Sequence, residues 1–187
     1  MASIDEALSG SDTYVTVSAD LHVSYIRVLS TSNSVVNLLV PKRHATLHIN
    51  DLSNTLLLVS NVDGAAHLTN LTNCVVVLKC HQFRMHDSRN TQVYLSCMSR
   101  PIIEHCTDIA FAEYPSVIGE KVGIQIEEEE WALKGLVEDF NWLRKESSPN
   151  WTMLKEKISD DTWRRILDML DTEKVDVSSI LNLVVER

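Results

Sequence analysis

Residues 71–78 read LTNCVVVL, a short polar segment that ends in an asparagine and is followed by apolar residues. The same arrangement recurs along the middle of the chain, with asparagine or aspartate at the aligned position. The segments are TSNSVVNLLV (31–40), LSNTLLLV (52–59), LTNCVVVL (71–78), SRNTQVYL (88–95) and CTDIAFAEY (106–114). The aligned residues are Asn33, Asn54, Asn73, Asn90 and Asp108, separated by 21, 19, 17 and 18 residues by subtraction. The chain therefore contains a repeat of about twenty residues.

A repeat of this length with short β-branched segments is typical of a stacked β-coil, in which each turn of chain returns above the previous one. Asparagine and aspartate suit a repeated corner because they tolerate left-handed backbone angles and hydrogen-bond within their own turn. The Val, Leu, Ile and Cys side chains after each corner suit a continuous apolar interior. An antiparallel β-sandwich also places strands about every 8 to 12 residues. The repeat therefore favours the β-coil and leaves the sandwich open.

Composition restricts the function. The chain has 187 residues, with 17 Lys and Arg against 26 Asp and Glu, and a formal net charge of −9. Its length suits one main domain with appended elements, and its charge argues against nucleic acid as a partner. No apolar run reaches the roughly 18 residues of a membrane helix, and no signal-peptide pattern is present. We therefore expect a cytoplasmic protein with no nucleic-acid or membrane partner.

The cysteines lie in apolar, strand-like segments without a C-x-x-C pair, at Cys74, Cys80, Cys97 and Cys106. This pattern predicts small buried thiols in a reducing compartment. The adjacent pairs Cys80–His81 and His105–Cys106 suggest a zinc site as the alternative. Neighbouring residues of a strand point to opposite faces and do not converge on one ion, so we expect no metal site.

The segment QFRMH, which begins at Gln82, alternates polar and apolar residues. Because successive side chains of a strand point to opposite faces, Phe83 and Met85 are predicted to share one face. Gln82, Arg84 and His86 would then share the other. The segment is thus an apolar anchor beneath a polar crest, which is either ordinary solvated surface or an arginine presented to a partner.

The pattern changes after Tyr114, where the repeat ends. The acidic stretch from Glu127 to Glu130 is typical of a solvated turn or helix start. We also expect it to form part of the surface that binds a partner protein. Ser159 is a suitable N-cap for a helix whose apolar residues have helical spacing: Trp163, Ile166, Leu167 and Leu170. A second short helix is predicted over 178–185. We expect the apolar faces of both helices to pack on the β core, with a partner surface as the alternative.

Several segments, taken together and in order, carry a resemblance to a known family. They are CHQFRMHDSRN (80–90), VYLSCMSRPIIEHC (93–106), IAFAEY (109–114), VEDFNWL (137–143) and SPNW (148–151). With these words the sequence resembles the C-terminal domain of tubulin-binding cofactor C, over about residues 30 to 155. This family is related to the X-linked retinitis pigmentosa GTPase-activating protein and to the C-terminal domain of cyclase-associated proteins. The resemblance implies a right-handed parallel β-helix of short coils. Together with the helices expected near the C-terminus, the predicted fold class is mainly β, a right-handed parallel β-helix of short coils with C-terminal helices packed on it.

The resemblance also sets the expected domain organisation. We expect a flexible N-terminus over 1–12, the cofactor C-like β-helix domain over 13–156 and a helical extension over 157–187. Cofactor C proteins generally carry an N-terminal helical domain that interacts with tubulin. This chain begins almost at the β region, so we expect a short homologue or a fragment.

For function, the resemblance implies a GTPase-activating protein that acts in trans and has no self-contained catalytic site. Arg84 matches the family's arginine finger, which stabilises the negative charge that develops as the γ-phosphate is transferred. Gln82, on the same face, is expected to orient Arg84 or to contact the nucleotide pocket. The resemblance implies no cofactor for this chain, because the GTP and magnesium belong to the partner.

Further residues are expected to contact the partner around this arginine. His86 would flank the contact, and Glu104 would brace the guanidinium from the next turn of the coil. Asp139, Phe140 and Asn141 match a family motif that lies by the same surface. For Phe140 the alternative is a place in the core, where aromatic side chains usually lie.

The leading hypothesis is a tubulin-folding cofactor associated with the cytoskeleton. It would act with cofactors D and E, stimulate GTP hydrolysis by β-tubulin through Arg84, and release the αβ-tubulin heterodimer. One alternative is a GTPase activator for an Arf-like small GTPase, although that branch has a lipid-modified N-terminus and Ala2 does not fit myristoylation. The other alternative is a non-catalytic scaffold that binds actin or tubulin.

Overall fold

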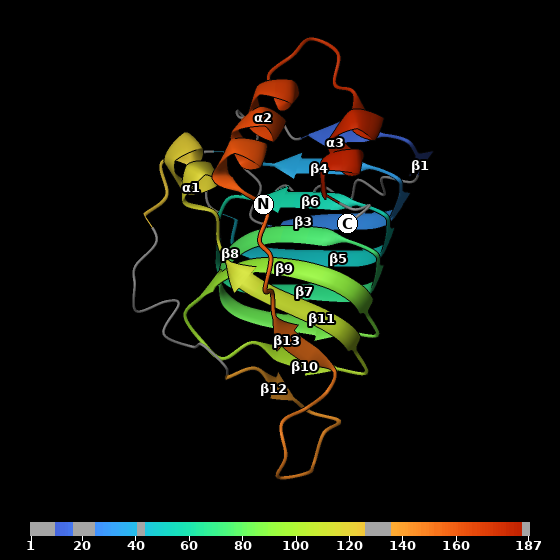
Figure 1. The fold of residues 1–187 in the computed structure, drawn as a ribbon, viewed down its shortest axis with the longest axis vertical. Coiled ribbons are helices and arrows are strands. Elements are labelled where there is room, and N and C mark those ends of the chain that lie inside the picture. The colour runs from blue at the N-terminus through green and yellow to red at the C-terminus, as the bar shows by residue number, and fades with distance from the viewer. Residues whose placement is uncertain (1–9, 17–24, 41–43, 126–135, 185–187) are drawn as a thin grey trace.

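The computed structural model describes residues 10–16, 25–40, 44–125 and 136–184. Its strands alternate between two sides of a coil whose turns stack along the long axis of the molecule (Figure 1). The strands of the upper turns are β1 (Gly10–Ser11), β2 (Tyr14–Thr16), β3 (Tyr25–Ser32), β4 (Val35–Leu38), β5 (Thr46–Ser53) and β6 (Leu56–Val59). Those of the lower turns are β7 (Val62–Thr72), β8 (Val75–His86), β9 (Arg89–Cys97), β10 (Ile102–Glu104), β11 (Thr107–Glu113), β12 (Glu138–Asp139) and β13 (Trp151–Met153).

Two parallel sheets form the sides of the coil. The first sheet contains β3, β5, β7, the C-terminal half of β8, β10 and β12. The second sheet contains β2, β4, β6, the N-terminal half of β8, β9, β11 and β13. Every pairing between described strands is parallel, which an antiparallel sandwich does not allow. The predicted parallel β-helix with C-terminal helices is therefore confirmed.

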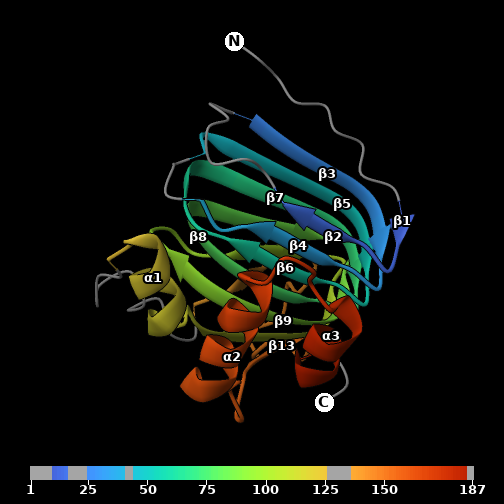
Figure 2. The ribbon, with the colours of Figure 1, turned by 90° about the horizontal axis from the view of Figure 1, so that it is seen from above.

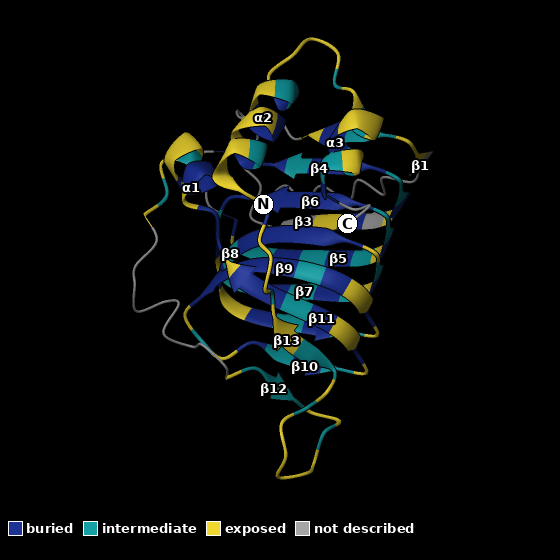
Figure 3. Ribbon diagram, in the orientation of Figure 1, coloured by how far each residue is buried: buried dark blue, intermediate teal, exposed yellow. Residues whose placement is uncertain are grey.

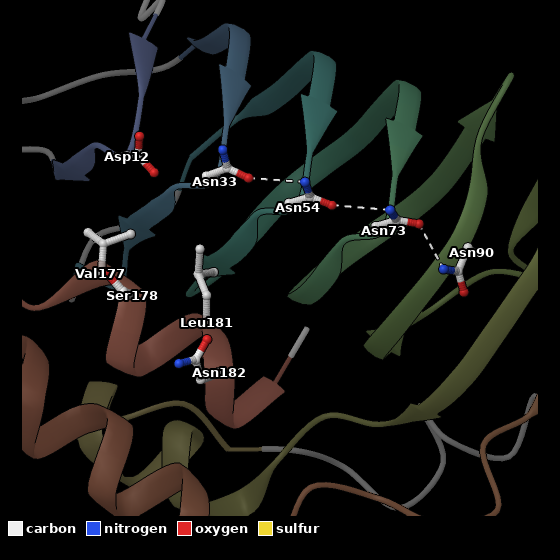
Figure 4. A pocket seen from close by; sticks show the side chains of 9 residues that line it. All are labelled: Asp12, Asn33, Asn54, Asn73, Asn90, Val177, Ser178, Leu181 and Asn182. Atoms are coloured by element: carbon white, nitrogen blue, oxygen red, sulfur yellow. Dashed lines mark hydrogen bonds between the residues drawn. The ribbon is translucent and has the colours of Figure 1, made fainter. Parts of the chain in front are cut away.

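The aligned asparagines form the corner at which the chain passes from the first sheet to the second. Asn33, Asn54, Asn73 and Asn90 have φ angles of 48°, 46°, 55° and 45°, the left-handed values predicted for this corner. Their side chains also form a ladder (Figure 4). Each amide Nδ2 donates to Oδ1 of the asparagine one turn earlier, over 3.0, 3.1 and 2.7 Å along the series. The ladder ties the turns of the coil together at this edge.

Replacing Asn54 with alanine is expected to lower the free energy of unfolding by about 2 to 3 kcal/mol. The change removes two ladder hydrogen bonds. It also places alanine, which tolerates left-handed backbone angles less well than asparagine, at a positive φ. Asn54→Gly loses the same bonds but tolerates the backbone angle, so its loss is expected to be smaller. Urea denaturation of both variants measures the difference. Equal stability of Asn54→Ala and the parent chain would show that the ladder contributes nothing.

The interior of the coil is a continuous apolar core. It contains aliphatic side chains from every turn, together with Phe83, Phe111 and the four cysteines. All four thiols are free and buried, which confirms the predicted buried thiols. In the part of the chain that the structure describes, no group of three or more His, Cys, Asp or Glu side chains is arranged to hold a metal ion.

Three described helices pack against the second sheet (Figure 2): α1 (Ser116–Val122), α2 (Asp160–Leu170) and α3 (Val177–Val184). The Oγ of Ser159 accepts a hydrogen bond from the Thr162 amide, as expected for the N-cap of α2. Trp163 of α2 is buried, with its ring centroid 5.3 Å from that of Tyr94 on β9. Exposed residues lie on the outer surfaces of α2 and α3 (Figure 3). Both predicted helices and their packing on the β core are thus confirmed, while α1 was not predicted.

Some expectations concern segments at the margins of the fold. Residues 1–9 and the acidic stretch 127–130 lie outside the described residues. The strand β1 falls inside the segment expected to be flexible, and it pairs with β3. The domain boundaries at 12 and 156 stay a prediction. None of the described helices has the length and apolar character needed to cross a membrane.

Candidate functional site

The crest predicted for QFRMH is present on the outer face of the first sheet. Phe83 and Met85 are buried, with 1% and 0% of their surface exposed. Gln82 is exposed, and Arg84 and His86 are half-buried on the opposite face of the strand. The predicted alternation is therefore confirmed, and the crest stands on the apolar core of the coil.

Arg84 lies within the sheet between two neighbouring strands. It is in register with His67 on β7 and with Ile102 on β10. Within residues 10–16, 25–40, 44–125 and 136–184, its guanidinium forms no hydrogen bond or ion pair. The charged group is therefore held at the surface with its donors available to another molecule.

Gln82 lies at the start of the same crest, beside Ala65 of β7. Its amide forms no hydrogen bond to Arg84 or to any other residue in the described ranges. The two side chains share one face of β8, so both are open to the same partner. The orienting role expected for Gln82 stays a prediction.

Glu104 lies beside His86 rather than beside Arg84, because β10 pairs with β8 in that register. Its Oε2 is 3.2 Å from Nδ1 of His86, and both side chains are about one third exposed. The carboxylate is thus engaged with the imidazole instead of the guanidinium that it was expected to brace. Partner contacts by His86 and Glu104 stay predictions.

Asp139 organises the segment that follows β12. Its Oδ1 accepts a hydrogen bond from the Asn141 amide at 3.1 Å. Its Oδ2 accepts hydrogen bonds from the Ser148 hydroxyl at 2.6 Å and the Asn150 side chain at 2.7 Å. Asn141 in turn accepts a hydrogen bond from the His105 amide at 2.7 Å. Both residues thus have structural tasks, and their predicted contact with a partner is not tested.

Replacing Asp139 with alanine is expected to lower the free energy of unfolding by about 2 to 3 kcal/mol. The half-buried carboxylate accepts three hydrogen bonds, and bonds to a charged acceptor are stronger than average. Hydrogen exchange should accelerate over 139–150 in this variant. Glu146→Ala, an exposed change in the same segment, is the control. Unchanged exchange in Asp139→Ala would contradict this role.

Phe140 is half exposed, at 50%, so it is not part of the core. Its backbone amide donates to the Ile103 carbonyl at 3.0 Å, which carries the parallel pairing one residue beyond β12. In that register Phe140 lies beside Glu104, which in turn lies beside His86 on β8. Leu143, three residues later, is 94% exposed and was not predicted as a site residue. Phe140 therefore presents an exposed apolar side chain near the His86 end of the crest.

Two histidines that were not predicted as site residues lie beside Arg84 in the sheet. His67 is in register with Arg84, and His48 is in register with His67 on the next strand. By subtraction, His48 and His67 are 19 residues apart, and His67 and Arg84 are 17 apart. The aligned asparagines from Asn54 to Asn90 have the same two spacings. The repeat itself is therefore the signal that locates them.

Comparisons with known proteins agree with this fold. The family model described as Tubulin binding cofactor C matches residues 23–140. Human tubulin-specific chaperone C is 30% identical over 152 residues, which cover 78% of this chain and 42% of the human protein. Tubulin-folding cofactor C of Arabidopsis thaliana is 39% identical over 102 residues, which cover 51% of this chain and 29% of the plant protein.

A solved structure is also similar. Tubulin Binding Cofactor C from Leishmania major has a TM-score of 0.53 and 25% identity, with 79% of this chain and 86% of that chain covered. This chain spans less than half the length of the human and Arabidopsis relatives. Because the family model covers more than half of the chain, and the segments that it spans build the crest and the coil beneath it, the chain belongs to the tubulin binding cofactor C family.

Proposed function

We propose that this chain is a GTPase-activating protein of the tubulin-folding machinery, with Arg84 as the arginine finger. The proposal rests on the position and contacts of the Arg84 guanidinium. Its guanidinium stands on the outer face of a parallel strand, without an ion pair or hydrogen bond in the described part of the chain. The strand beneath it is fixed by the buried side chains of Phe83 and Met85.

This arrangement suits the chemistry of phosphoryl transfer. In the transition state, negative charge spreads over the γ-phosphoryl oxygens and the leaving oxygen, and a guanidinium supplied by a partner stabilises it. An arginine finger typically accelerates hydrolysis by about 10³ to 10⁵. Placing the finger on a strand rather than a loop lowers the entropy lost on binding, because its backbone is already ordered. The GTP and magnesium ion would come from the partner.

Surrounding residues would complete the contact. Gln82 lies on the same face and would reach the nucleotide or the backbone beside it. The contact between His86 Nδ1 and Glu104 Oε2 at 3.2 Å keeps that carboxylate occupied, so it would not compete with phosphate for Arg84. Phe140 would supply an apolar contact at the edge of the site.

The proposed partner is αβ-tubulin in a complex with cofactors D and E, in the cytoplasm. Support comes from the relatives, which are named as a tubulin-specific chaperone and a tubulin-folding cofactor. Stimulated hydrolysis by β-tubulin would then release the native heterodimer. An Arf-like GTPase is the alternative target of the same arginine.

Single-turnover hydrolysis tests the choice of partner. GTP-loaded tubulin with cofactors D and E is mixed with this chain, and GTP-loaded Arf-like GTPase is mixed with it in parallel. We expect faster hydrolysis in the tubulin mixture and none above background in the other. Acceleration of the Arf-like GTPase alone would overturn the proposed partner, and no acceleration in either mixture would overturn the proposed activity.

A further inference from the structure

Four side chains with basic groups form a straight row across the outer face of the first sheet. Arg27 of β3 is in register with His48 of β5, His48 with His67 of β7, and His67 with Arg84 of β8. We name Arg27, His48, His67 and Arg84 the cationic row. Neighbouring strands of a sheet lie about 4.8 Å apart, so the row is about 14 Å long. It leads away from Arg84 across three strands.

The row is unusual in a chain with a formal net charge of −9. The carboxylates beside its Arg84 end are already paired. Glu104 contacts His86 at 3.2 Å, and Glu138, which lies beyond Ile102 in the same register, contacts Arg100 at 3.1 Å. The surface around Arg84 therefore offers positive groups whose neighbouring carboxylates have other partners.

The two histidines respond to this positive environment. Their rings stack, with centroids 4.8 Å apart and planes inclined by 25°. Burial lowers the pKa of His67, and His48, Arg84 and His86 lower it further. Burial and then Arg27 lower the pKa of His48. Burial and the nearby positive groups together disfavour protonation of both imidazoles.

From this geometry we infer that the cationic row is a docking surface for an acidic, extended polypeptide segment of a partner protein. A segment laid across the strands would bring its carboxylates over successive basic groups of the row. That this segment belongs to the GTPase reached by Arg84 rests on the proposed function. Binding of an acidic segment to the row does not depend on it.

Charge complementarity favours a polypeptide over nucleic acid. Nucleic-acid binding draws its affinity from the neutralisation of several phosphates by lysine and arginine. The row contains two arginines, Arg27 and Arg84, in a strongly acidic chain that would repel a long polyanion. A short acidic segment carries fewer charges and fits the length of the row.

The geometry has a consequence for pH dependence. In the free protein the pKa values of His48 and His67 are lower than that of an ordinary histidine, because burial and then the neighbouring positive groups disfavour the charged form. A bound carboxylate favours the protonated form and raises both pKa values. The complex then binds more protons than the free protein does. The affinity for the acidic segment therefore rises as the pH falls through the pKa values of the two histidines.

Fluorescence anisotropy with a labelled oligoglutamate peptide tests the inference directly. We expect binding that weakens with added salt and that becomes about twofold to tenfold tighter between pH about 7.5 and about 6. In the double variant His48→Gln and His67→Gln, the tightening should disappear. His81→Gln is the matched control, because His81 is an exposed histidine of β8 outside the row. Thermal melting checks that all variants fold alike.

Several outcomes would overturn the inference. They are the absence of oligoglutamate binding at low salt, equal pH dependence in the double variant and the parent chain, and preferential binding of a single-stranded RNA of matched charge. The outcome is separable from that of the proposed function. Peptide binding without any stimulated GTP hydrolysis would support the docking surface and reject the activity. Stimulated GTP hydrolysis without peptide binding would support the activity and reject the docking surface.

Discussion

Arg84→Lys is expected to lose most of the stimulation of GTP hydrolysis, with a single-turnover rate lower than that of the parent chain by about 10³ to 10⁵. This loss corresponds to about 4 to 7 kcal/mol of barrier. Lysine keeps the positive charge but lacks the planar fork with which arginine bridges two oxygens. The measurement is single-turnover hydrolysis in the tubulin mixture with cofactors D and E. Arg84→Ala is expected to fall at least as far.

A matched control separates the finger from a general effect of charge. Arg89 is an exposed arginine at the start of β9, outside the cationic row, so Arg89→Ala should hydrolyse GTP at nearly the parent rate. Melting temperatures should agree among the three variants, because Arg84 and Arg89 lie outside the core. A near-normal rate for Arg84→Lys would refute the finger geometry. Parent-like stimulation by Arg84→Ala would favour the non-catalytic scaffold.

Much of the fold was predictable because its signals are local. The corner needs residues that tolerate positive φ, and Asn33, Asn54, Asn73 and Asn90 supply them at each turn. Alternation along a strand then decides which side chains enter the core, as Phe83 and Met85 do. The helix over 160–170 follows from its cap and its apolar spacing. Each of these features depends on a few consecutive residues.

Contacts between turns were predicted less well, because they depend on register. Glu104 was expected to brace Arg84, although its separation from His86 is 18 residues, the spacing between the last two aligned corners, Asn90 and Asp108. Applying that spacing places Glu104 beside His86, as the structure does. The same count would have assembled the cationic row. The asparagine ladder likewise requires the turns to be stacked before it can be recognised.

The strand pairing of the segment after the last complete turn could not be predicted from the repeat spacing. Asp139 lies beside Ile103, 36 residues earlier in the chain, because an insertion interrupts the repeat. No fixed period predicts such a pairing. The three hydrogen bonds that the Asp139 carboxylate accepts come from residues up to 11 positions later, in irregular structure. Its structural task therefore emerged only from the folded chain.

Phe83→Ala is expected to lower the free energy of unfolding by about 3 to 5 kcal/mol, the cost of emptying a well-packed aromatic site. Phe83 is 1% exposed, and its ring packs edge-to-face on Phe111 with centroids 6.0 Å apart. Urea denaturation measures the loss. Phe140→Ala, which removes a half-exposed ring, should cost far less.

The same variant tests whether the support beneath Arg84 matters for activity. Phe83→Leu keeps most of the apolar volume, so it should cost less than about 1.5 kcal/mol and keep its stimulation of GTP hydrolysis. In Phe83→Ala, measured where the chain is still folded, stimulation should fall because the strand under Arg84 is less firmly held. Full stimulation by folded Phe83→Ala would separate the two roles. Phe83 would then stabilise the coil without positioning the arginine, and the hydrogen-bonded neighbours β7 and β10 would be sufficient to hold it.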